Sequence, residues 1–142
     1  MALLVPAVMT GCFGSGSPRV EIMENGVYMR HAVQSYTITG ARNGATTHAT
    51  ALITLHDGDR ITIDLDVAYN PAPELAAGEW KREGKVAEAG QVHAESLKFL
   101  GGQGSTPSVG GRFRLETNGN PRLRVLLPAQ PLARAPQSQP AG

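Results

Sequence analysis

Residues 49–67, ATALITLHDGDRITIDLDV, decide the fold of this 142-residue chain. Apolar and polar residues alternate on both sides of the central HDG. The apolar positions are Ala49, Ala51, Ile53, Leu55, Ile61, Ile63, Leu65 and Val67. Alternation of this kind predicts two strands, each of which buries one face. The stretch therefore predicts a β-hairpin whose apolar face belongs to the core.

The loop of this hairpin follows from the apolar pattern. A two-residue turn at Asp57-Gly58 would pair Ile53 with Thr62 and would mix the two faces along the whole ladder. A three-residue loop, His56-Asp57-Gly58, with its glycine left-handed and an accompanying bulge, pairs Ile53 with Ile61 instead. The sequence predicts the longer loop, because a one-residue slip moves every side chain to the other face.

The same register brings polar residues together on the outer face of the hairpin. It places His48 opposite Asp66, and Thr50 opposite Asp64. His48, Asp64 and Asp66 are the best candidates for a metal site, since a catalytic zinc site has three such ligands and an open position. The plainer interpretation is a charge-assisted histidine–aspartate pair on a solvated sheet face. Only the metal interpretation implies an enzyme, a small metal-dependent hydrolase.

Two more hairpins are predicted near the ends of the chain. Asn25-Gly26 favours a two-residue turn with positive φ at both residues. It joins strands at 20–24 and 27–30. The apolar residues Ile22 and Met29 then stand opposite each other, and so do the oppositely charged Glu21 and Arg30. The second hairpin joins residues 112–115 to residues 123–127 around the turn at 118–121.

The region between these hairpins is harder to interpret. Proline and glycine punctuate it, and Glu74 to Trp80 is expected to form a single helical turn. Lys81 to Gly90 is either a short helix or a polar crossing loop, and a strand resumes at residues 96–100. Trp80 is expected in the core or at its rim, in preference to a sugar-stacking platform.

These elements together define the fold class and the domains. The length suits one domain, and we expect an all-β fold, a small antiparallel β-sandwich or barrel of about six to eight short strands. This domain spans residues 19–127. The remaining residues, 128–142, are rich in proline, glutamine and alanine and lack periodicity, so we expect them to be a disordered tail.

The first residues indicate a membrane anchor. Residues 2–9 are apolar, too few for a membrane-spanning helix, which needs about 20 residues, but suited to a secretory signal. The following Val8-Met9-Thr10-Gly11-Cys12 resembles the lipobox of bacterial lipoprotein precursors. The resemblance implies removal of residues 1–11, acylation of Cys12 and a tether over residues 12–18. The alternative is an ordinary first strand with Cys12 as a small buried residue.

The resemblance also implies a location and a partner. The chain would lie in the bacterial cell envelope, attached to the membrane through acylated Cys12. Phe13 stands where the lipoprotein class usually has Asp as an inner-membrane retention signal, which favours the outer membrane, with the domain facing the periplasm or the cell surface. The partner in the envelope is then a protein or a small ligand that the sequence does not identify.

Charge and cysteine content exclude several function classes. Thirteen basic and twelve acidic residues give a net charge of +1, whereas nucleic-acid binding needs clustered cations. The single cysteine excludes an internal disulfide and cysteine-rich metal sites. The glycine-rich residues 101–111 are not followed by the helix and Lys-Ser/Thr of a phosphate loop. We expect a loop between strands there, which can also contact a ligand or partner. No cofactor is expected.

An arginine stripe is the other candidate site. Arg112, Arg114, Arg122 and Arg124 are expected on the outer face of the last hairpin, with Lys98 nearby. Guanidinium groups match phosphate and carboxylate, so the stripe is a candidate anion site for lipid headgroups or acidic glycans. The plainer interpretation is a solvated face whose charge Asp64 and Asp66 balance.

The sequence thus predicts a non-enzymatic lipoprotein of the cell envelope, a lipid-anchored β-rich binding or assembly module. Two alternatives remain open. One is the hydrolase described above, and the other is a small-ligand carrier with a lipocalin-like barrel, for which the inward Ala49 and Ala51 would leave room.

Overall fold

The computed structural model describes residues 17–69, 72–100 and 106–133. Those residues form nine strands. The strands are β1 (Arg19–Glu24), β2 (Val27–His31), β3 (Val33–Asn43), β4 (Thr46–Leu55), β5 (Arg60–Tyr69), β6 (Pro73–Glu83), β7 (Glu88–Leu100), β8 (Ser108–Thr117) and β9 (Asn120–Pro131). All belong to one antiparallel sheet in the order β2-β1-β9-β8-β7-β6-β5-β4-β3.

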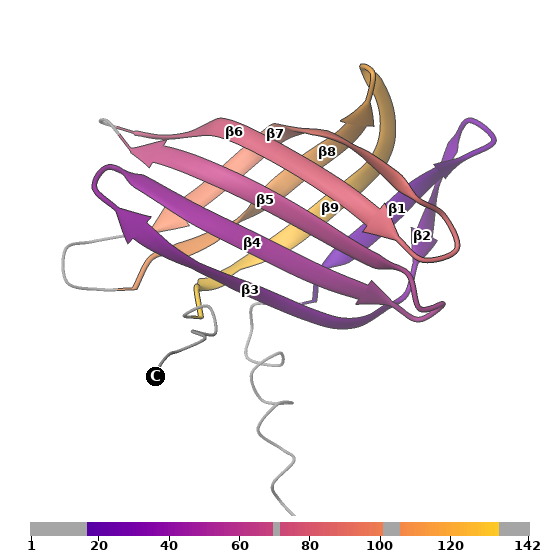
Figure 1. Cartoon of the computed structure of the whole chain (residues 1–142), viewed down its shortest axis with the longest axis horizontal. Helices are drawn as coiled ribbons and strands as arrows, with labels where there is room; N and C mark the ends of the chain where they lie inside the picture. The colour runs from indigo at the N-terminus through magenta and orange to yellow at the C-terminus, as the bar shows by residue number, and fades with distance from the viewer. Residues whose placement is uncertain (1–16, 70–71, 101–105, 134–142) are drawn as a thin grey trace, which may run out of the picture.

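The sheet curls into a half-barrel. In Figure 1, β3 to β6 lie in front, and β8, β9 and β1 cross behind them. The edge strands β2 and β3 stand at opposite ends of the strand order, yet Ala32 alone separates them in the chain. One connecting residue forces the two edges to approach each other at this point. The β4–β5 loop also contacts this connection, because the His56 amide donates to the Ala32 carbonyl at 3.0 Å.

The all-β, antiparallel prediction is confirmed, but the expected number and length of strands are not. Nine strands form a single sheet, so the two stacked sheets of a β-sandwich are not what the described residues build. Most strands have ten or more residues, and β7 has 13. A long sheet twists strongly, and this curvature lets its two halves cover each other.

The predicted hairpins are confirmed in detail. Ile53 pairs with Ile61 across the three-residue loop, and Gly58 has φ of 99°. Ile22 pairs with Met29 across a turn in which Asn25 and Gly26 have φ of 52° and 81°. The β8–β9 hairpin turns at Asn118-Gly119 with nearly the same angles, 53° and 81°.

The helical turn expected at Glu74 to Trp80 is wrong, and so are the helix and the crossing loop proposed for residues 81–90. Both regions belong to the hairpin of β6 and β7, with residues 84–87 as its short connection, and these strands pair with each other and with β5 and β8. Residues 75–79 lack clear alternation because they include two alanines and Gly78. Sheet pairing on both sides of β6 therefore overrides the local preference. Trp80 is 2% exposed, which confirms the core assignment, and its Nε1 donates to the Glu116 carbonyl at 3.0 Å.

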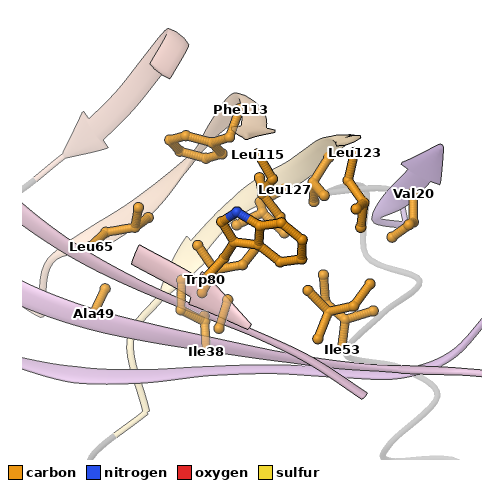
Figure 2. Close-up of a cluster of buried hydrophobic side chains, with 14 of the residues drawn as sticks. Val20, Ile38, Ala49, Ile53, Leu65, Trp80, Phe113, Leu115, Leu123 and Leu127 are labelled. Carbon is orange, nitrogen blue, oxygen red and sulfur yellow. The ribbon is translucent and has the colours of Figure 1, made fainter. Parts of the chain in front are cut away.

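A single core fills the space between the two halves of the sheet. Figure 2 shows Leu65, Ile38 and Ile53 from the front strands facing Phe113 and Leu123 from the back strands, with Trp80 between them. All these side chains are at most 2% exposed. At roughly 25 cal/mol per Å² of buried apolar surface, burial of each large side chain contributes about 1.5–3 kcal/mol.

The sheet continues further than the sequence suggested. Residues 128–142 were expected to be disordered, but β9 extends to Pro131, and Leu132 is 5% exposed in the core. Ala133 then bridges to β3: its amide donates to the Ile38 carbonyl, and its carbonyl accepts from the Gly40 amide, both at 3.0 Å. Burial of the Leu132 side chain in the core accounts for this continuation. The rest of the expected tail, residues 134–142, lies outside the described residues.

A buried ion pair ties two neighbouring loops together. Asp59, after the β4–β5 loop, is 1% exposed and lies 2.9 Å from both Nε and Nη2 of Arg82. Its other oxygen accepts from the Lys85 amide at 2.8 Å. The Lys85 amide, burial and Arg82 act together on this carboxyl, and the net effect is a lowered pKa for Asp59. Its charge is therefore stabilised in the folded state.

The described residues contain no helix that is long and apolar enough to cross a membrane. The lipobox-like residues and Cys12 lie outside the described residues, so the anchor remains a prediction from sequence.

Candidate functional site

The arginine stripe forms only in part. Arg112, Arg114 and Arg124 lie on the outer face, because their neighbours Phe113 and Val125 are fully buried on the inner one. Arg114 and Arg124 stand directly opposite each other on β8 and β9. The structure therefore brings three of the four predicted arginines to one surface.

Arg122 belongs to another cluster. A bulge between Leu115 and Glu116 interrupts the β8–β9 ladder next to it. Its Nε donates to Glu88 at 2.8 Å, and this hydrogen bond raises the pKa of Arg122. Glu88 also lies 3.4 Å from Arg82, so Arg122 extends the ion-pair network of Asp59. The expectation of a four-arginine stripe is corrected accordingly, because the bulge redirects this one side chain.

A hollow opens beside the three remaining arginines. It has a volume of about 370 Å³ and lies across four adjacent strands, β1, β9, β8 and β7. Its lining consists of Arg19, Glu21, Glu95, Arg112, Arg124 and Leu126. Register explains the grouping, since Leu126 stands opposite Arg19 on one side and opposite Arg112 on the other. We call this feature the outer hollow.

A second bulge shapes the outer hollow. The β7–β8 ladder shifts between Ala94 and Ser96, which leaves Glu95 as the extra residue. A bulge of this kind re-aims a side chain locally. Glu95 consequently lies in the outer hollow, near both Arg114 and Arg124. The corner is tight, because Gly111 has φ of 142° and a Cβ there would lie 2.3 Å from the Ser96 carbonyl oxygen.

Glutamates balance the arginines of this face. Arg114 donates from Nε to Glu116 at 2.6 Å, and this hydrogen bond raises the pKa of Arg114. Arg124 is held more loosely, 3.7 Å from Glu21 and 3.9 Å from Glu95. The balancing carboxylates were expected to be Asp64 and Asp66, and this expectation is wrong. Those residues lie on β5, whereas the glutamates come from the strands around the hollow.

An aromatic ring covers part of this cluster. The Arg124 guanidinium carbon lies 4.5 Å from the centre of the Tyr28 ring, a cation–π contact. Tyr28 comes from the edge strand β2, two strands away from Arg124 in the sheet. Tyr28 therefore packs against one of the arginines that line the outer hollow.

The predicted histidine–aspartate group does assemble. His48 Nδ1 lies 2.7 Å from Asp66 Oδ1, and Nε2 lies 3.8 Å from Asp64 Oδ1. Thr50 donates to the same Asp64 oxygen at 2.7 Å. Both ring nitrogens thus face carboxylates on an exposed surface, which is the geometry of a charge-assisted pair. In the part of the chain that the structure describes, no group of three or more His, Cys, Asp or Glu side chains could hold a metal ion.

The glycine-rich stretch becomes strand at its end. Ser108 to Gly111 open β8, and Gly110 and Gly111 are buried between neighbouring strands, not poised at a helix start. Residues 101–105 and Cys12 lie outside the described residues.

Sequence reasoning missed four of the six residues that line the outer hollow. Arg19, Glu21, Glu95 and Leu126 were not considered as site residues, and neither was Tyr28. The signal for Glu21 was present, since it was predicted on the outer face of its hairpin. Its position beside Arg124 was not predictable, because it depends on the pairing of β1 with β9, strands a hundred residues apart.

No known protein family, no curated protein and no solved structure matches this chain.

Proposed function

We propose that this chain is a lipid-anchored binding module of the bacterial cell envelope, which acts by binding and not by catalysis. Cys12 carries the acyl chains, residues 12–18 form the tether, and the β domain presents its binding surface close to the bilayer. The outer membrane is the proposed location, as Phe13 suggests. Acyl chains stabilise membrane attachment by about 0.8 kcal/mol for each buried CH₂, and stable anchoring takes more than one chain.

The observation that carries this proposal is the position of the outer hollow relative to the proposed anchor. Arg19, the first residue of β1, lines the hollow. Arg19 lies seven positions after Cys12 in the sequence, so the chain between them spans at most about 25 Å, at roughly 3.3–3.6 Å per residue. This charged hollow would then stay within one tether length of the membrane.

The alternatives lack comparable support. Of the proposed metal ligands, His48 is exposed and Asp64 and Asp66 are half-buried, and the histidine nitrogens already face carboxylates. A carrier needs an internal cavity, but Ala49 and Ala51 are fully buried in a packed core.

The anchor is tested by intact-mass analysis of protein from the membrane fraction of a bacterial host. The expected species lacks residues 1–11 and carries acyl chains on Cys12. Cys12→Ser should yield an unmodified protein in the soluble fraction, while the matched control Ser17→Ala should remain acylated and bound. Membrane retention of Cys12→Ser would contradict the proposal.

A further inference from the structure

The outer hollow carries both signs of charge. Three guanidinium groups, of Arg19, Arg112 and Arg124, face two carboxylates, of Glu21 and Glu95. A ligand with only negative charge would meet those two carboxylates, and a ligand with only positive charge would meet the three arginines. The lining is therefore complementary to a ligand that contains an anionic and a cationic group together.

Among the described residues, these arginines use little of their hydrogen-bonding capacity. Ion pairs between described residues on this face involve Arg114 and Arg124 but not Arg19 or Arg112. Arg124 Nε is buried and has no hydrogen-bond partner among the described residues, and its two ion pairs are longer than hydrogen bonds. A buried donor without an acceptor is costly, and buried polar groups normally have partners. If a ligand with an acceptor group bound in the hollow, a small shift of the Arg124 side chain would let its guanidinium group donate to that acceptor.

The size of the outer hollow limits the ligand. Its volume of about 370 Å³ lies near the lower end of the range for small-molecule sites, roughly 300–1,000 Å³. The only apolar side chain in the lining is that of Leu126. This suits a polar headgroup and not an acyl chain. Guanidinium groups bind phosphate in a bidentate geometry, and a primary ammonium is the matching donor for Glu21 and Glu95.

The geometry points to a binding site for ethanolamine phosphate, the zwitterionic headgroup of a bilayer lipid. Arg112 and Arg19 hold the phosphate together with Arg124, and Glu21 and Glu95 accept from the ammonium. The lipid source of this headgroup rests on the proposed membrane anchor, since the tether keeps the hollow close to the bilayer. Headgroup binding would orient the domain on the membrane that carries it.

The first experiment uses the full-length Cys12→Ser chain, so that its outcome does not depend on acylation. Soluble ethanolamine phosphate is titrated against the ¹⁵N-labelled protein, and amide shifts are followed. The largest shifts should occur in β1, β9, β8 and the Glu95 region of β7. Arg112→Gln should weaken binding roughly 10-fold or more, as expected for the loss of hydrogen bonds to a charged group. The matched control Arg60→Gln, an exposed arginine on β5, should leave it unchanged.

The charge of the carboxylates is tested separately. Glycerol phosphate, which has no ammonium, should bind more weakly than ethanolamine phosphate, and Glu95→Gln should reduce that preference. Unfolding curves of each variant confirm that it is folded. Equal binding of the two phosphates, or unchanged binding by Arg112→Gln, would overturn the assignment of this site.

The lipid source is tested with vesicles. The Cys12→Ser chain should float with vesicles that contain phosphatidylethanolamine and should not float with vesicles of phosphatidylcholine alone, whose quaternary ammonium has no N–H donor. Arg112→Gln should abolish flotation. Binding of soluble ethanolamine phosphate without flotation would overturn the bilayer source. Neither result bears on acylation of Cys12, which the intact mass decides.

Discussion

The buried carboxylate of Asp59 connects the β4–β5 loop to β6 and to the connection that follows β6. It holds the Arg82 guanidinium and the Lys85 amide at 2.8–2.9 Å, and Arg82 in turn reaches Glu88. Removing one partner of a buried pair leaves the other charge uncompensated, which destabilises proteins by about 3–5 kcal/mol.

Asp59→Asn should therefore lower the free energy of unfolding by about 3 kcal/mol at pH 7. The native pKa of Asp59 is depressed below the unfolded value of 3.8. Its charged form consequently stabilises the fold above that pH, and this contribution is lost as the pH falls through the native pKa. Urea unfolding from pH 7 to pH 2 should show the wild type and the variant converging in acid.

Asp57→Asn is the matched control for this prediction. Asp57 Oδ1 accepts from the Asp59 amide at 2.9 Å, and asparagine keeps that acceptor. The control should change the free energy of unfolding by less than about 0.5 kcal/mol. A difference between Asp59→Asn and the wild type that persists unchanged at pH 2 would contradict the role of this charge.

Local residue pairs were predictable, and partners from distant strands were not. Asn25-Gly26 fixed one turn, and the register of β4 with β5 followed from alternation. Both depend on residues close in sequence. The partners of Arg124 come from β1 and β7, and no local pattern specifies those neighbours.

At the scale of the element, β-bulges and close strand contacts build the outer hollow. The shift between Ala94 and Ser96 places Glu95 there, and the next pair along β8 is Gly111 with Leu97. The β8–β9 ladder also shifts between Val109 and Gly111. These two irregularities lie on either side of Gly111 along β8, and together they bend the sheet and form this corner.

Gly111→Ala should destabilise the protein by about 3 kcal/mol. The left-handed backbone contributes roughly 1–2 kcal/mol, and a Cβ placed 2.3 Å from the Ser96 carbonyl oxygen adds overpacking of about 1–3 kcal/mol. Gly44→Ala separates these effects, because Gly44 has φ of 69° and no atom lies within 4 Å of its added Cβ.

Denaturant unfolding measures both variants. Gly44→Ala should lose only the backbone contribution, about 1–2 kcal/mol. If both variants lost the same free energy of unfolding, the close approach of β7 to β8 would not contribute to the destabilisation of Gly111→Ala. Binding of ethanolamine phosphate should also weaken in Gly111→Ala, since Arg112 and Glu95 move with the corner.

At the scale of the whole molecule, the curl of the sheet depends on the connection between its two edge strands and on the hydrogen bonds made at the β3 edge. The single residue Ala32 connects β2 to β3, and Ala133 adds two hydrogen bonds to β3. An open sheet edge presents unpaired peptide groups to other chains. The Ala133 bridge protects part of the β3 edge and holds Leu132 in the core.

Ala133→Pro should remove the hydrogen bond from its amide to the Ile38 carbonyl. The expected loss is about 1–3 kcal/mol for a carbonyl left without its donor. Hydrogen exchange at the Gly40 amide, which donates to Ala133, should accelerate in parallel. Ala133→Ser keeps the amide and should behave like the wild type. Equal exchange rates in both variants would contradict a closing role for this bridge.

The sequence by itself determined the all-β class, three hairpins, the registers of two of them and the inward face of β4 and β5. Each depends on period-two alternation or on turn residues, which act between neighbours in the chain. The tertiary structure alone decided that β6 is a strand, that β9 pairs with β1, and that Arg19, Glu21 and Glu95 join Arg112 and Arg124. Those outcomes depend on curvature and on contacts between distant segments, whose free energy is gained only when the whole sheet has formed.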